Sequence, residues 1–163
     1  MNDFEKRLEK AIERGQQVRD LRGREKQLRA LTEAELRNLH SKYRLELSDH
    51  IEKCLRSLAD RFPGFEFETI VGEEGWGARI SRDDLGFSQE GRPENFYNRL
   101  EMVIRPFSPT HIVELAAKAT IRNKELFNRN YYQKLSELKL ETYVEVIDQW
   151  VLEFAERFSA EVP

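Results

Sequence analysis

The hydrophobic residues of this chain change their spacing twice along its length. Up to Phe62 they recur every three or four positions, which is the period of a helix. Between residues 65 and 122 they recur every second position, the period of strands, and from residue 140 onward the helical period returns. The pattern predicts an α+β fold with N-terminal helices, a four-stranded antiparallel meander sheet and a C-terminal helix packed on the sheet.

The first helical segment carries a thin apolar stripe. Its members are Phe4, Leu8, Ala11, Ile12, Val18, Leu21, Leu28 and Leu31. Gly15 and Gly23 interrupt the stripe, and each glycine weakens a helix by about 1 kcal/mol relative to alanine. We expect such a helix to need a partner surface. Residues 1–31 are therefore interpreted as a basic amphipathic helical arm, and residues 32–163 as a single α+β domain.

The second helical segment has the stronger apolar stripe, from Leu36 to Phe62. Thr32 and Glu35 have the spacing of a capping box, which predicts that this helix begins near Glu33. Pro63 and the glycine after it predict its end, because proline cannot continue the helical hydrogen bonds. The pattern allows two separate helices or one long kinked helix.

Period-two alternation predicts the strands and their order. The four runs cover residues 65–71, 76–81, 99–105 and 111–122. The first two runs flank a glycine-containing turn and predict a hairpin, whereas residues 82–95 are rich in charge, glycine and proline and predict a loop. A last helix is expected over residues 140–160.

Composition narrows the functional classes. Charged residues make up 35% of the chain but the net charge is −3, so no overall field recruits nucleic acid or an anionic membrane. The first 44 residues, which include the arm, carry twelve Lys or Arg against eight Asp or Glu and so have a basic balance. No apolar run approaches the roughly 20 residues of a membrane span. The acidic start does not resemble a secretory signal, and the lone Cys54 fits a reducing compartment, so a cytoplasmic location is expected.

Recognisable catalytic and metal motifs are missing from the sequence. The three histidines stand in different contexts without an HExxH pattern, and no GxSxG or phosphate-binding glycine loop occurs. His50 is interpreted as a neutral histidine at the core boundary, and Cys54 as a small packed side chain on the inward face of its helix. We therefore expect no metal, no cofactor and no catalytic residues.

One polar stretch, residues 119–137, combines asparagines, basic residues and two adjacent tyrosines. Together with the polar positions of the third predicted strand it suggests a groove for an anionic ligand. The candidate residues are Arg99, Glu101, Arg105, Arg122, Asn123, Asn128, Arg129 and Tyr131. Cross-strand ion pairs, asparagine turns and a crossover packed on the body would produce the same residues without a ligand.

Three functional hypotheses follow. The first is a protein-interaction or adaptor-like module that associates with itself, as a dimer, through the N-terminal helices. Trp76 is either a core residue at a strand start or an exposed ring that anchors a partner. The second hypothesis is a small anionic-ligand-binding or enzymatic domain, and the third is weak nucleic-acid binding by the basic helix. The expected interaction residues are Phe4, Leu8, Ile12, Val18, Leu21 and Trp76.

Overall fold

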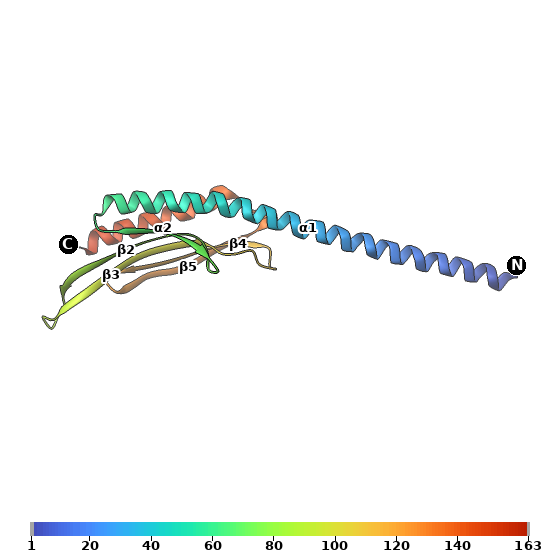
Figure 1. Ribbon diagram of the computed structural model, residues 1–163, viewed down its shortest axis with the longest axis horizontal. Coiled ribbons are helices and arrows are strands. Elements are labelled where there is room, and N and C mark those ends of the chain that lie inside the picture. Colours follow the sequence, from blue (N-terminus) through green and yellow to red (C-terminus); the bar gives the residue numbers. More distant parts are fainter. Residues whose placement is uncertain (1, 163) are drawn as a thin grey trace. The chain divides into compact units, whose positions relative to one another are not determined.

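The computed structural model describes residues 2–162, with the backbone alone for residues 28–31 (Figure 1). The chain forms two compact units, Met1–Asn38 and Leu39–Pro163, and each is described by itself. In chain order the elements are α1 (Asp3–Arg61), β1 (Glu66–Gly72), β2 (Gly75–Phe87), β3 (Pro93–Ile104), β4 (Ile112–Ile121), β5 (Lys124–Lys134), the short 3₁₀ helix η1 (Leu135–Glu137) and α2 (Leu140–Glu161). The predicted α+β fold is confirmed.

A single helix, α1, occupies the whole region before the sheet. Of the two predicted alternatives, the one long helix is confirmed, and the helix start near Glu33 is wrong. Thr32 and Glu35 match the capping pattern, but the residues around them are good helix formers without a proline, so the backbone stays helical through them. The end of α1 at Arg61 agrees with the proline signal, and Gly64 takes a left-handed φ of 97° in the turn that follows.

The sheet is an antiparallel meander of five strands in the order β1-β2-β3-β4-β5, not four as predicted. The additional strand, β5, lies inside the polar stretch. It pairs with β4 from Ile121↔Lys124 to Ile112↔Lys134, with a bulge between Ala119 and Thr120. Its inward positions include Arg129, Tyr131 and Gln133, whose polar ends hide the period-two pattern in the sequence.

The predicted loop at residues 82–95 is also wrong, because β2 and β3 extend through most of it. Their pairing continues from Arg82↔Asn98 to Phe87↔Pro93. Polar side chains that suggested a loop are paired inside this ribbon: Arg82 forms two hydrogen bonds to Asp84, at 2.7 and 2.9 Å, and Asn98 donates to Asp84 at 3.0 Å. Because these polar and charged side chains are hydrogen-bonded to one another, they are compatible with strand structure.

Within residues 39–162, α2 and the C-terminal half of α1 lie on the same face of the sheet (Figure 1). Core side chains from both helices meet those of the strands. The fully buried ones include Leu47, Ile51, Leu55, Ile80, Leu100, Met102, Leu115, Tyr143, Ile147 and Phe154. At one end of the helix pair, Phe62 and Phe65 pack edge-on against Phe158 with ring centroids 4.9 and 5.1 Å apart. The opposite face of the sheet is not covered by either helix.

Among the described residues, neither helix carries an apolar segment sufficient to cross a membrane.

Candidate functional site

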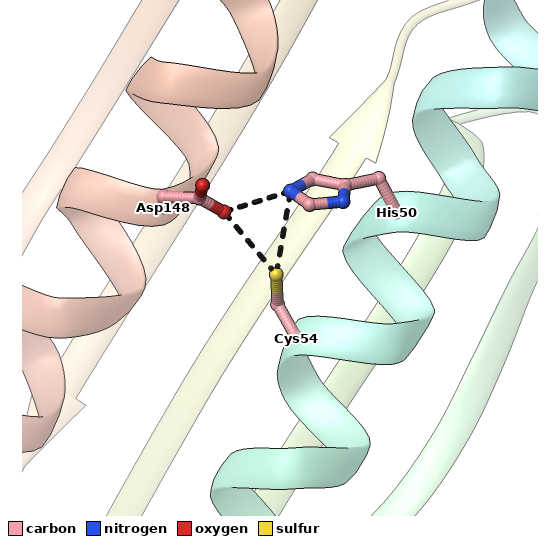
Figure 2. A group of neighbouring side chains, drawn as sticks. All are labelled: His50, Cys54 and Asp148. Carbon is pink, nitrogen blue, oxygen red and sulfur yellow. Dashed lines mark hydrogen bonds and ion pairs between the residues drawn. The ribbon is translucent and has the colours of Figure 1, made fainter.

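The two helices above the sheet bring a histidine, a cysteine and an aspartate together (Figure 2). His50 and Cys54 are four residues apart on α1, so they project from consecutive turns on one face of the helix. Asp148 projects toward them from α2, which packs beside α1. The site thus depends on helical spacing for two of its members and on tertiary packing for the third.

The three polar atoms of this cluster converge on one point. His50 Nε2 lies 2.7 Å from Asp148 Oδ1, and Cys54 Sγ lies 3.5 Å from each of these two atoms. All three side chains are half-buried, with His50 28% and Asp148 46% exposed. The atoms are therefore ordered by mutual contact yet remain accessible from solvent.

A hollow of about 480 Å³ adjoins the cluster between α1 and α2, and all three residues line it. The rest of its wall is apolar on the α2 side, from Val151, Leu152 and Ala155, and carries Lys53 and Arg61 on the α1 side. An apolar wall with a few convergent polar groups is the usual composition of a ligand site.

The cluster does not have the arrangement of a nucleophilic triad. In such a triad the carboxylate binds one ring nitrogen of histidine and the nucleophile binds the other. Here both Asp148 and Cys54 contact Nε2. Burial, followed by the hydrogen bond to Asp148 and its charge, raises the pKa of Cys54 to about 11, so the thiol stays protonated at neutral pH. The same three atoms, nitrogen, sulfur and oxygen, are instead a donor set for a metal ion.

Sequence reasoning considered His50 and Cys54 separately and assigned neither to a site. Their four-residue separation on a helix was the available signal, because it places two metal-binding side chains on one face. Asp148 is 94 positions beyond Cys54, and no local pattern connects the two.

Four of the predicted ligand residues share the uncovered face of the sheet. Arg99, Glu101 and Arg105 alternate with the buried positions of β3, and Asn128 joins them through the pairing of Glu101 with Lys118 and of Lys118 with Asn128. Ion pairs cross this face. Glu101 lies 3.6 Å from Arg79, and Arg105 lies 3.6 Å from Glu114.

Arg122 and Asn123 form the turn between β4 and β5. Both have left-handed backbones, with φ of 49° and 69°. The Asn123 side chain accepts from the Tyr97 amide at 2.7 Å and donates to the Asn95 carbonyl at 3.0 Å, while the Arg122 guanidinium stacks 4.0 Å from the Phe96 ring. These contacts tie the turn to β3.

Arg129 and Tyr131 lie on the other side of the sheet, under α2. Arg129 forms a bidentate ion pair with Glu153, at 2.5 and 3.2 Å, and the Tyr131 ring packs edge-on against Tyr143 at 5.0 Å. The eight predicted ligand residues are thus divided among the uncovered face, a turn and the helix-covered face.

The predicted interaction residues fall into two environments. Phe4, Leu8, Ile12, Val18 and Leu21 are 47–69% exposed, whereas Trp76 is half-buried beneath Arg44, whose guanidinium lies 4.1 Å from the ring. The stripe members Leu28 and Leu31 lie outside the described side chains.

Comparison with known proteins adds no relative from which a role could be transferred. No protein family, no curated protein and no solved structure matches the chain.

Proposed function

We propose that the protein is a non-catalytic interaction module that associates with a second copy of itself through the apolar stripe of α1. The observation that carries the proposal is the exposure, by 47–69%, of five large apolar side chains within one helical unit of the chain. Burying a valine, leucine, isoleucine or phenylalanine side chain contributes about 1.5–3 kcal/mol. Five such side chains on one segment make association favourable.

The spacing of the apolar residues in this segment favours a second helix as the binding partner. Phe4, Leu8, Ala11, Gly15 and Val18 follow one another at intervals of four, three, four and three residues. This is the spacing of the two apolar positions of a coiled-coil heptad. Ile12 and Leu21 flank this seam and widen it.

Charge favours an antiparallel second copy. With Ala11 opposite Gly15 of the second copy, Leu8 comes opposite Val18 and Ile12 meets its own equivalent near the two-fold axis. Glu5 then lies near Arg19 of the second copy, an attractive pair that occurs twice, and these two attractive pairs outnumber the single repulsive contact of Arg14 with its own equivalent. In a parallel pair, Arg14 would instead lie beside Arg19 of the other helix, and the two positive charges would repel each other.

Sedimentation velocity of the full chain over a range of concentrations tests this proposal. We expect a monomer–dimer equilibrium that Leu8→Glu weakens at least about 100-fold, because each dimer loses two buried leucine side chains. Leu45→Glu is the matched control, since Leu45 lies on the same helix, is 58% exposed and is outside the stripe. A chain that stays monomeric at every concentration, or an equal effect of both variants, would contradict the proposal.

The other two hypotheses have less support. For an anionic ligand on the sheet, the favourable observation is that Arg99 Nε is a buried atom without a hydrogen-bond partner among the described residues. The same face, however, carries the carboxylates of Glu101 and Glu114 beside the arginines. For nucleic acid, acidic residues interrupt the basic ones along the arm. A cytoplasmic setting remains our proposal, and it fits the free Cys54.

A further inference from the structure

The cluster between α1 and α2 combines three donor types that one class of metal ion accepts together. Imidazole nitrogen, thiolate sulfur and carboxylate oxygen are the protein ligands of zinc. Thiolate selects against the hard cations Mg²⁺ and Ca²⁺, which take oxygen ligands. His50, Cys54 and Asp148 provide one of each, and Figure 2 shows the three side chains pointing toward one another.

The separations of the donor atoms approach those of a tetrahedral site. Zinc bonds of about 2.3 Å to sulfur and about 2.0–2.1 Å to nitrogen or oxygen place neighbouring ligand atoms roughly 3.3–3.6 Å apart. Cys54 Sγ lies 3.5 Å from His50 Nε2 and 3.5 Å from Asp148 Oδ1. The third separation, 2.7 Å between Nε2 and Oδ1, is a hydrogen bond and has to widen when the metal replaces the shared proton.

Charge and access also fit a divalent ion. The Cys54 thiolate and the Asp148 carboxylate together neutralise a double positive charge, which lowers the cost of holding it in a half-buried site. The hollow beside the cluster provides the route from solvent. Three protein ligands leave the fourth tetrahedral position free to take water or another ligand from this hollow.

We propose that His50 Nε2, Cys54 Sγ and Asp148 Oδ1 form a binding site for one zinc-type divalent ion, with the fourth position open toward the hollow between α1 and α2. On binding, the Cys54 thiol gives up its proton and the sulfur lone pair forms the bond to the metal. The neutral His50 ring then carries its proton on Nδ1, so the Nε2 lone pair binds the metal, and the hydrogen bond between Nε2 and Asp148 is replaced by one metal bond from each of these two residues. The site belongs to residues 39–162 and does not depend on self-association.

Titration of the untagged, chelator-stripped full chain with Co²⁺ tests the proposal, because cobalt replaces zinc and is visible by absorption. We expect saturation at one equivalent, a near-ultraviolet band from thiolate-to-cobalt charge transfer, and release of protons into weakly buffered solution. Zn²⁺ should displace the cobalt, with a Kd on the order of micromolar or tighter. Zinc should also raise the melting temperature, whereas Mg²⁺ should not.

Substitutions of the three ligand residues test where the metal binds. Cys54→Ser should abolish the charge-transfer band, with Cys54→Ala as a second variant. His50→Ala and Asp148→Asn should each weaken binding at least about tenfold, since loss of even an outer-shell partner typically costs about 10–100-fold. Asp49→Asn, next to His50 in sequence, and Ser48→Ala, on the same helix and outside the lining of the hollow, are matched controls and should bind as the unchanged chain does.

Circular dichroism and thermal unfolding of each metal-free variant establish that it is folded before binding is compared. The proposal is overturned if excess Co²⁺ produces no thiolate band in the folded chain. It is equally overturned if the variants of the three ligand residues bind zinc as tightly as the two controls do.

Discussion

The hydroxyl of Tyr143 joins α2 to the two strands beneath it. It donates to the Val113 carbonyl at 2.6 Å and accepts from the Gln133 amide at 2.8 Å, and the side chain is fully buried. Val113 and Gln133 face each other across β4 and β5, so one hydroxyl satisfies a backbone group on each strand. Burial raises the pKa of Tyr143, which keeps the hydroxyl a neutral donor across the physiological range.

At the scale of a single residue, we predict that Tyr143→Phe lowers the free energy of unfolding by about 1–3 kcal/mol. The phenyl ring still fills the space, but a buried carbonyl and a buried amide lose their partner. Urea denaturation measures the change. Tyr132→Phe, at a position 63% exposed on β5, is the control and should have an effect within about 0.5 kcal/mol. Equal effects of the two substitutions would contradict the assigned role.

The β4–β5 hairpin is the element that the hydrophobic pattern of the sequence does not predict. Its turn consists of Arg122 and Asn123, both left-handed, as two-residue hairpin turns require. Asparagine tolerates this backbone, and its side chain also bonds to β3, through the Tyr97 amide and the Asn95 carbonyl. The turn therefore fastens β5 to the sheet through β3 as well as through β4.

We predict that Asn123→Ala destabilises the chain by about 1–3 kcal/mol, as a left-handed alanine costs about 1–2 kcal/mol and three side-chain hydrogen bonds, to Tyr97, Asn95 and Glu94, are lost. Asn123→Gly separates these causes. Glycine adopts the left-handed backbone without strain but, like alanine, cannot form the side-chain hydrogen bonds. We therefore expect Asn123→Gly to lower the free energy of unfolding by roughly 1 kcal/mol less than Asn123→Ala does. Chemical denaturation of both variants checks this order. Alanine tolerated as well as glycine would argue against the backbone requirement.

On the scale of the whole molecule, the chain consists of two units with different sources of stability. Residues 39–162 share one core between two helices and a sheet, in which Ile51 is fully buried. In the other unit, Ile12 is 53% exposed. Both tryptophans of the chain, Trp76 and Trp150, belong to the second unit, so their fluorescence reports on the unfolding of that unit.

We predict that Ile51→Ala lowers the unfolding free energy measured by tryptophan fluorescence by about 2–5 kcal/mol, because it leaves a cavity in the core. Ile12→Ala should leave the same transition unchanged within about 0.5 kcal/mol at concentrations where the chain is monomeric. A shift of similar size in both variants would show that the two units unfold as one.

Local periodicity was sufficient for the elements that bury one clean apolar stripe. The C-terminal helix was predicted over residues 140–160 and extends over Leu140–Glu161, and the first hairpin was predicted with its turn in the correct place. Local periodicity was insufficient to predict β5 and the extension of β2 and β3. There the inward or paired side chains are polar, as with Arg129 and Arg82, and only contacts across strands reveal their role.

The sequence by itself determined the order and type of most elements, because the periods of 3.6 and 2 residues follow from backbone geometry and appear wherever one face is buried. Tertiary structure decided the fifth strand, the partners of the arginines and the meeting of His50 and Cys54 with Asp148. Those features depend on which distant segments pack together. The two residues are 98 positions apart, and no local pattern in the sequence records their contact.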